Sequence, residues 1–181
     1  MRQLPNLLSL LRFALAPWCA IAIFEAEFPK ALTLFFVAGG TDFFDGYLAR
    51  RFGWHSALGR MLDPLADKAL MAMVYFALWM AGAVRGWLVA LVFGRDLFIL
   101  LGALIIALRT GTREFAPSLA GKLSTAFQLG AALFVLCERC GWCSVQVAEA
   151  WTWAAAAGTV ASGGDYLRLG WRMMRQGAPR S

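Results

Sequence analysis

Charged residues are scarce in this chain. Of its 181 residues only 15% are charged, whereas 60% are hydrophobic, and there is a single histidine. Together with a mean hydropathy of +0.62, this composition excludes an ordinary soluble globule and favours a helical protein that crosses a membrane several times. The chain also lacks a low-complexity segment, a clear internal repeat and a soluble accessory domain, so we expect one domain over residues 1–181.

Long apolar runs fill most of the sequence. Six of them approach the ~20 residues that a helix needs to cross a bilayer, which predicts an all-α bundle of six transmembrane helices. The expected ranges are 6–25, 30–50, 60–81, 86–108, 122–139 and 147–167. No small-residue cleavage site follows the first run, so we interpret it as a retained span and not a signal peptide. Pro17 predicts a kink in that span.

Lysine and arginine are divided unequally between the two sides of these predicted spans, and positive residues favour the cytoplasmic side. One side carries only Lys30, Arg85 and Arg139. The other side carries Arg2, Arg12, Arg50, Arg51, Arg60, Arg109, Arg113, Lys122, Arg168, Arg172, Arg175 and Arg180. This asymmetry predicts that both termini lie in the cytoplasm. The net charge of +6 suits an anionic leaflet and anionic substrates, so no nucleic-acid partner is needed to explain it.

Acidic residues are few, yet four aspartates gather at the cytoplasmic ends of the second and third predicted spans. Asp42 and Asp45 are spaced i,i+3, and Asp63 and Asp67 are spaced i,i+4, so each pair lies on one face of a helix. Four converging carboxylates would repel one another and take up protons unless cations kept them ionised. An all-oxygen cluster suits hard divalent cations, Mg²⁺ or Mn²⁺. Acidic groups inside membrane segments are also candidates for function by default.

The spacing of these aspartates belongs to a longer pattern that specifies eight positions across 26 residues. The matching residues are Asp42, Asp45, Gly46, Ala49, Arg50, Gly59, Asp63 and Asp67. This pattern matches the signature of the CDP-alcohol phosphatidyltransferase family, which the chain resembles. Residues 5–12, 62–68 and 121–128 are similar to the branch that makes glycerophospholipids, so the resemblance extends from the N-terminus to the fifth predicted span.

The resemblance implies an integral membrane enzyme, a homodimer, that moves a phosphatidyl group from CDP-diacylglycerol to an alcohol and releases CMP. It implies that two divalent cations are held by Asp42, Asp45 and Asp63, with help from Asp67, which also acts as general base on the acceptor hydroxyl. His55 is the next residue to consider as base. The CDP moiety is expected to contact Asn6, Thr41, Asp45, Gly46, Ala49, Arg50 and Gly59.

Two acceptors remain open. The Arg95-Asp96 pair and residues 56–59 look like the cardiolipin synthase pattern, which uses phosphatidylglycerol, and we favour that acceptor. Residues 113–115, Arg-Glu-Phe, instead resemble the synthase that uses glycerol 3-phosphate. Arg95, Arg113 and Lys122 are the candidates for holding an acceptor phosphate, because guanidinium forks match phosphate oxygens. Arg95 has the alternative of pairing with Asp96 or with the aspartate cluster. We expect the site to face the cytoplasm, in a bacterial inner membrane.

Competing interpretations exist for several features. Gly46, Ala49 and Gly59 also suit close helix packing, and Arg50 also suits an interfacial arginine. Intramembrane carboxylates mark transporters too, but here they cluster at one end and no second cluster marks an inverted half. A non-catalytic protein that binds CDP-lipid is the other alternative. Cys137, Cys140 and Cys143 lie across the membrane from the aspartates, where a disulfide or simple apolar packing is favoured over a metal site.

Overall fold

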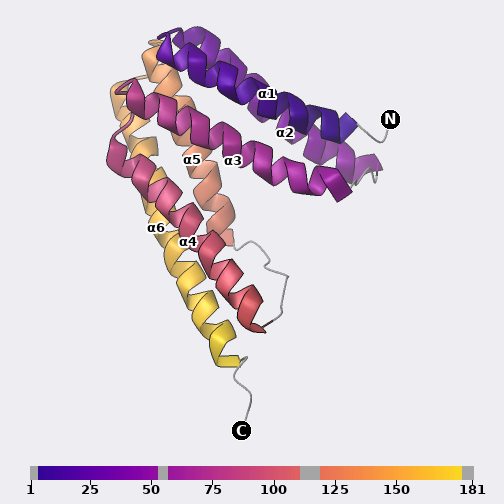
Figure 1. The fold of residues 1–181 in the computed structure, drawn as a ribbon. Helices are drawn as coiled ribbons and strands as arrows, with labels where there is room; N and C mark the ends of the chain where they lie inside the picture. The colour runs from indigo at the N-terminus through magenta and orange to yellow at the C-terminus, as the bar shows by residue number, and fades with distance from the viewer. Residues whose placement is uncertain (1–3, 53–56, 111–118, 177–181) are drawn as a thin grey trace. The chain divides into compact units, whose positions relative to one another are not determined.

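The computed structural model describes residues 4–52, 57–110 and 119–176, with side chains at 10–41, 65–102, 105 and 119–169. The described residues form six helices in chain order and no strand (Figure 1). They are α1 (Leu4–Phe24), α2 (Phe28–Phe52), α3 (Ala57–Met80), α4 (Gly86–Thr110), α5 (Leu119–Arg139) and α6 (Val145–Gln176). The prediction of an all-α chain with six helices is confirmed.

The helices agree with the predicted spans within a few residues except at the end of α6. We expected the sixth span to stop at residue 167, whereas α6 continues to Gln176. A bilayer limits the length of an apolar run, but the backbone hydrogen bonds of a helix continue wherever the residues favour them. Arginine, leucine and methionine, which occupy seven of the nine positions from 167 to 175, are good helix formers. The α-helix also continues through Pro17 in α1.

One helix in the described part of the chain, α5, is long and apolar enough to cross a membrane, with a mean hydropathy of 1.5. A shorter apolar stretch, Leu10–Phe24, lies in α1. The six-span arrangement and the side on which the termini lie stay predictions.

The helices group into two compact units, which we describe separately. The first consists of residues 1–85 and 132–144. Within it α1 packs against both α2 and α3. On α1 the buried positions recur at intervals of four and three residues, at Arg12, Ala16, Cys19 and Ile23. Small residues dominate the contact, which lets the helices approach closely.

Two hydrogen bonds fix how α1 and α2 align. The Cys19 thiol donates to the carbonyl of Ala31 at 3.4 Å, and the Arg12 Nε donates to the carbonyl of Ala38 at 3.2 Å. The donors are seven residues apart on α1 and the acceptors seven residues apart on α2, in the opposite direction. The two helices are therefore antiparallel with one constant register. Continued for one more turn or two, that register brings residues 5–8 of α1 level with residues 42–45 of α2.

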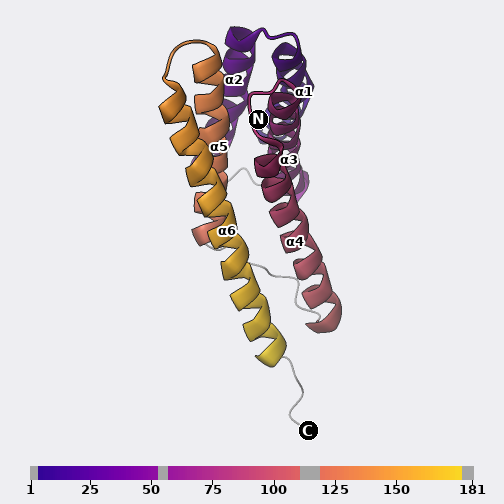
Figure 2. The same cartoon turned by 90° about the vertical axis from the view of Figure 1, so that its left-hand side faces the viewer.

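The second unit consists of residues 86–131 and 145–181. In it α4 packs against α6, and residues 119–131 of α5 run beside α6 (Figure 2). Trp87 of α4 and Trp153 of α6 place their ring centroids 5.3 Å apart. The ring of Trp151 lies 6.1 Å from that of Phe127, on α5. Both tryptophans of α6 therefore pack against another helix.

Gly130 on α5 gives a test of this packing. A Cβ added there would lie 2.4 Å from the Trp151 ring, so we expect Gly130→Ala to destabilise the protein by about 1–3 kcal/mol, as overpacking does. Gly164 on α6 has nothing within 4 Å of its added Cβ. There the better helix propensity of alanine should make Gly164→Ala neutral or stabilising by up to about 1 kcal/mol. Thermal unfolding of both variants in detergent measures the contrast, and equal melting temperatures would contradict this packing of Trp151.

Candidate functional site

The first aspartate pair continues the buried face of α2. Ala31, Phe35 and Ala38 are buried on this helix at intervals of four and three residues. The same intervals lead next to Asp42 and Asp45. Both aspartates therefore occupy register positions on the face of α2 that packs inside the first unit.

The second pair has the same relation to α3. Asp63 is seven residues before Leu70 and Asp67 seven residues before Val74, and both apolar residues are buried. Seven residues are about two helical turns, so the four residues share one side of α3. Val74 is fully buried, whereas the Asp67 side chain is 48% exposed. This side of α3 is thus closed at Val74 and accessible to solvent at Asp67.

Asp67 is the one predicted metal ligand whose side chain the structure describes. Its Oδ1 accepts a hydrogen bond of 2.7 Å from Nη1 of Arg12, and the two form an ion pair. The Arg12 side chain is 1% exposed, and its Nε is bonded to Ala38 of α2. Ala38 is one helical turn before Asp42, and Asp67 is one turn from Asp63. Both aspartate pairs therefore come from the same end of the α2–α3 hairpin.

Most of the other predicted site residues lie outside the described side chains. These are Asn6, Asp42, Asp45, Gly46, Ala49, Arg50, His55, Gly59, Asp63 and Arg113. The predictions for them remain predictions. Thr41, expected to contact the CDP moiety, is described: its hydroxyl donates to the carbonyl of Ala38 at 2.7 Å. It therefore lies at the same carbonyl that holds Arg12.

The donor set fits divalent cations. The backbone of α2 is helical through both Asp42 and Asp45, and that of α3 is helical through Asp63 and Asp67, so each helix offers two carboxylates on one face. Oxygen donors of this kind suit Mg²⁺ and Mn²⁺. Within the part of the chain whose side chains are described, no three acidic, cysteine or histidine residues are grouped as metal ligands. Asp67 alone of the four predicted ligands belongs to that part.

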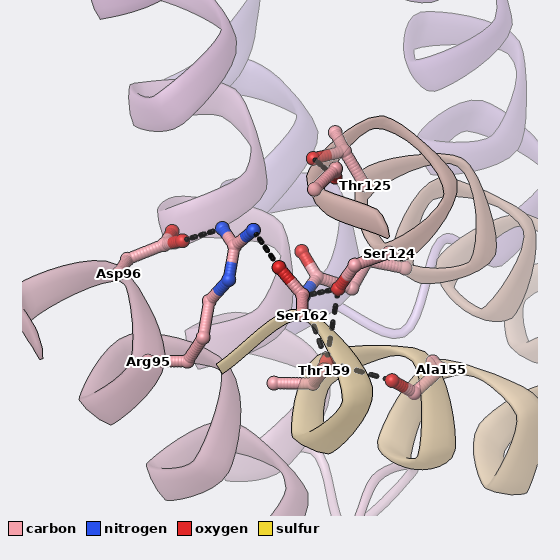
Figure 3. Close-up of polar contacts among 9 residues, drawn as sticks. Arg95, Asp96, Ser124, Thr125, Ala155, Thr159 and Ser162 are labelled. Carbon is pink, nitrogen blue, oxygen red and sulfur yellow. Dashed lines mark hydrogen bonds and ion pairs between the residues drawn. The ribbon is translucent and has the colours of Figure 1, made fainter. Parts of the chain in front are cut away.

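Arg95 lies in a polar cluster of the second unit (Figure 3). Its side chain is 10% exposed, and Nη1 donates to Asp96 at 2.7 Å. Its Nη2 donates to the hydroxyl of Ser162 on α6 at 2.5 Å. The guanidinium also lies over the Tyr166 ring, 5.7 Å from its centroid. The Arg95–Asp96 pairing that the sequence left open is present, and Ser162 and Tyr166 are added to it. Nε is buried with no hydrogen-bond partner among the described residues.

Three buried polar side chains, Ser124, Gln128 and Thr159, are bonded to one another at the α5–α6 contact. Gln128 donates to the Thr159 hydroxyl at 2.9 Å and to that of Ser124 at 3.3 Å. Thr159 in turn donates to the carbonyl of Ala155 at 2.7 Å. All three side chains are buried, so these bonds satisfy groups that would otherwise be costly to bury. Lys122, the third candidate for an acceptor phosphate, is exposed near the start of α5.

The four cysteines are not joined by disulfides. Cys143 donates to the carbonyl of Phe134 at 3.3 Å, and burial raises the pKa of the Cys140 thiol above its ordinary value. A raised pKa disfavours the thiolate that metal binding requires. Of the two interpretations favoured from the sequence, these contacts agree with apolar packing.

Three residues of these contacts, Arg12, Ser162 and Tyr166, have no role predicted from the sequence. Arg12 belongs to the charges expected on the cytoplasmic side, whereas in the structure it is completely buried. A signal was present, because Arg12 falls within an apolar run at the same intervals as Ala16, Cys19 and Ile23. A charged residue at a core position of an apolar helix is a reason to look for a partner. No comparable signal marked Ser162 or Tyr166, since polar residues recur throughout the end of α6.

The sequence matches known proteins over most of its length. The model of the CDP-alcohol phosphatidyltransferase family matches residues 2–161. A Rattus norvegicus protein named cardiolipin synthase (CMP-forming) is 35% identical over 142 residues, which cover 70% of this chain and 47% of that protein. A Cereibacter sphaeroides protein named CDP-diacylglycerol–glycerol-3-phosphate 3-phosphatidyltransferase is 37% identical over 128 residues, or 67% of this chain and 53% of that protein. The chain thus spans about half the length of these two relatives.

A Bacillus subtilis protein, also named CDP-diacylglycerol–glycerol-3-phosphate 3-phosphatidyltransferase, matches from end to end. It is 29% identical over 192 residues, which cover 97% of this chain and 98% of that protein. The family match includes all eight signature positions between Asp42 and Asp67 as well as Arg12. On this match, and on the placement of the signature at one end of two adjacent helices, the chain belongs to the CDP-alcohol phosphatidyltransferase family.

Proposed function

We propose that this protein is a phospholipid-synthesising phosphatidyltransferase, which moves a phosphatidyl group from CDP-diacylglycerol to a glycerol-type acceptor and releases CMP. One observation carries the proposal: in a member of this family, the full aspartate signature lies at one end of α2 and α3, where Asp67 is half exposed. An aspartate that is exposed at the site can come within hydrogen-bond distance of an acceptor hydroxyl and take its proton.

Asp42, Asp45, Asp63 and Asp67 are the residues that would hold two divalent cations, Mg²⁺ or Mn²⁺. Bound there, the cations neutralise the pyrophosphate of CDP-diacylglycerol and stabilise the phosphate of the departing CMP. Thr41 is one of the residues that we expect to contact the CDP moiety, and its hydroxyl bonds the Ala38 carbonyl, one helical turn before Asp42.

The transfer needs a proton acceptor, because an alcohol is a weak nucleophile until its proton is removed. Asp67 takes the proton of the acceptor hydroxyl. The hydroxyl oxygen then bonds to the phosphorus of the phosphatidyl group, and the bond from that phosphorus to the oxygen of CMP breaks. CMP leaves with the electron pair of that bond, so charge and atoms balance.

The surface agrees with a membrane location. Large apolar side chains are widely exposed on α1, α2 and α4, including Trp18 at 60%, Phe36 at 65% and Leu100 at 67%. Exposed apolar surface on this scale belongs in lipid or against another protein. We propose six membrane spans, both termini and the aspartate site on the cytoplasmic face, and a homodimer in a bacterial inner membrane. The charge asymmetry between the ends of the helices supports this orientation.

Phosphatidylglycerol is the acceptor that we propose, which would give cardiolipin, and glycerol 3-phosphate is the second candidate. Relatives with each name match the chain at similar identity, so they favour neither acceptor. Asp96 and Ser162 each bond one terminal nitrogen of Arg95. An acceptor phosphate would therefore have to use Nε or the second N–H of a terminal nitrogen. Arg113 and Lys122 keep their proposed role.

Release of CMP by the purified protein in detergent tests the proposal. We expect CMP to appear with CDP-diacylglycerol, Mg²⁺ or Mn²⁺ and phosphatidylglycerol, and to be absent when the acceptor is omitted. Mass spectrometry of the lipid product separates cardiolipin from phosphatidylglycerophosphate, so activity with glycerol 3-phosphate alone would replace the first acceptor by the second. Protein that binds CDP-diacylglycerol but releases no CMP with any acceptor would contradict the enzyme and support a non-catalytic binding protein. Failure to bind CDP-diacylglycerol at all would return the transporter to consideration.

A further inference from the structure

We propose that Arg12 is a positioning residue, which holds the Asp67 carboxylate in the orientation that accepts the proton of the acceptor alcohol. This inference rests on the proposed function, in which Asp67 is the base. Arg12 touches Asp67 from α1, a helix that carries none of the four aspartates. Nothing in the signature pattern includes it.

The first step of the argument is that Arg12 is itself fixed. Its side chain is 1% exposed, and its position on α1 belongs to the buried series that continues with Ala16 and Cys19. Nε donates to the Ala38 carbonyl, which belongs to the backbone of α2 and cannot rotate away. A planar guanidinium with one nitrogen anchored in this way has a set direction for its other nitrogens. The direction of Nη1 therefore sets the position of the carboxylate oxygen on α3 that accepts its hydrogen bond.

The second step is the contrast in exposure across the ion pair. Asp67 is 48% exposed whereas Arg12 is 1% exposed. Arg12 therefore supports the carboxylate from the protein interior, through Oδ1 at 2.7 Å, while about half of the Asp67 side chain stays exposed. Charge-assisted bonds to arginine are among the stronger and more directional contacts of a carboxylate. The contact restricts the carboxylate to one orientation and leaves it accessible.

The third step is what this orientation does. Arg12 bonds both helices that carry the aspartates. Its contact on α2 lies one turn before Asp42, and its contact on α3 lies one turn after Asp63. It thereby sets the proton acceptor relative to both helices that carry the site. A base must lie within hydrogen-bond reach of the proton it removes. A displacement of about 1 Å can lower a rate by ~100-fold, so loss of this support should appear in turnover more than in substrate binding.

An arginine that only joined helices would behave differently. Arg139 offers the comparison: its Nη2 donates to the Gly82 carbonyl at 3.1 Å, and its guanidinium lies over the Phe28 ring. It bridges segments of the same unit as Arg12 does, but it contacts no predicted site residue. Arg139→Met is therefore the control for an arginine that joins segments outside the site, although its side chain is 36% exposed and that of Arg12 is 1% exposed. We expect it to lower the melting temperature without changing kcat.

The test compares Arg12→Met and Arg12→Lys with wild type and with Arg139→Met. We expect Arg12→Met to lower kcat by about 100-fold, with the KM for CDP-diacylglycerol and the affinity for it changed by less than about twofold. Arg12→Lys keeps a cation but lacks the fork that reaches Ala38 and Asp67 together, so its kcat should lie between wild type and Arg12→Met. If both Arg12 variants keep wild-type kcat, or lose activity only in proportion to folded protein, the positioning role is wrong. Should Arg12→Met fail to fold, Arg12→Lys decides alone.

A second measurement does not depend on activity. The melting temperatures of Arg12→Met, Asp67→Asn and the double variant form a cycle, which reports whether the two side chains interact in solution. We expect the double variant to lose fewer degrees than the two single losses added together. Strict additivity would overturn the contact and the inference with it. A wild-type protein that releases no CMP would refute the proposed function, and the cycle would still decide whether Arg12 holds Asp67.

Discussion

Replacement of Asp67 by asparagine should abolish CMP release while CDP-diacylglycerol still binds. Asparagine has nearly the same shape as aspartate but cannot take up the proton of the acceptor hydroxyl. Loss of a general base costs about 10²–10⁴-fold in rate, and Asp67 is also expected to help hold the divalent cations, so the loss should lie at the upper end. The measurement is CMP release under saturating lipid, together with equilibrium binding of CDP-diacylglycerol to the same preparation.

The control for Asp67→Asn is the same chemical change at a distant aspartate. Asp165 on α6 belongs to the second compact unit and has no proposed role in the chemistry. Asp165→Asn should keep wild-type turnover. Since Asp67 is the ion-pair partner of a buried arginine, the melting temperature of Asp67→Asn must be measured too. A folded Asp67→Asn protein that retains a tenth or more of wild-type turnover would remove Asp67 as the base.

Removal of divalent cations should have an effect of similar size. We expect excess EDTA to abolish CMP release and added Mg²⁺ or Mn²⁺ to restore it. Arg12 pairs with one carboxylate, but most of the charge of four carboxylates and a pyrophosphate would stay unbalanced without cations. Asp63→Asn should then shift the metal titration. Even changes outside the ligand shell typically weaken metal binding about 10–100-fold, so loss of a ligand should raise the half-saturating Mn²⁺ concentration at least tenfold and also lower the maximal rate.

Glu25→Gln is the control for the metal titration. Glu25 is exposed directly after the C-terminal end of α1 and 13 residues beyond Arg12, and neutralising it should leave the half-saturating concentration unchanged. A titration of Asp63→Asn that coincides with wild type would show that Asp63 is not a ligand. CMP release that survives exhaustive chelation would refute the divalent-cation site as a whole.

The sequence determined the helices. Each helix coincides with an apolar run, because the length of such a run and the local propensities of its residues act within a few turns of chain. The register of the aspartates on α2 and α3 followed in the same way, since positions three, four and seven residues apart share a face on any helix. The last helix extends beyond the expected membrane span, because hydropathy limits a membrane span and does not limit helical hydrogen bonding.

Only the tertiary structure decided which distant residues meet. Arg12 had to be placed opposite Ala38 and Asp67, and Arg95 opposite Ser162, which is 67 residues away along the chain. These contacts depend on how each helix is rotated about its own axis and shifted along its neighbour. Many side chains set that arrangement together, as Trp151 against Gly130 illustrates. The spacing of residues within one helix determines which of them share a face. It does not determine which residue of another helix packs against that face.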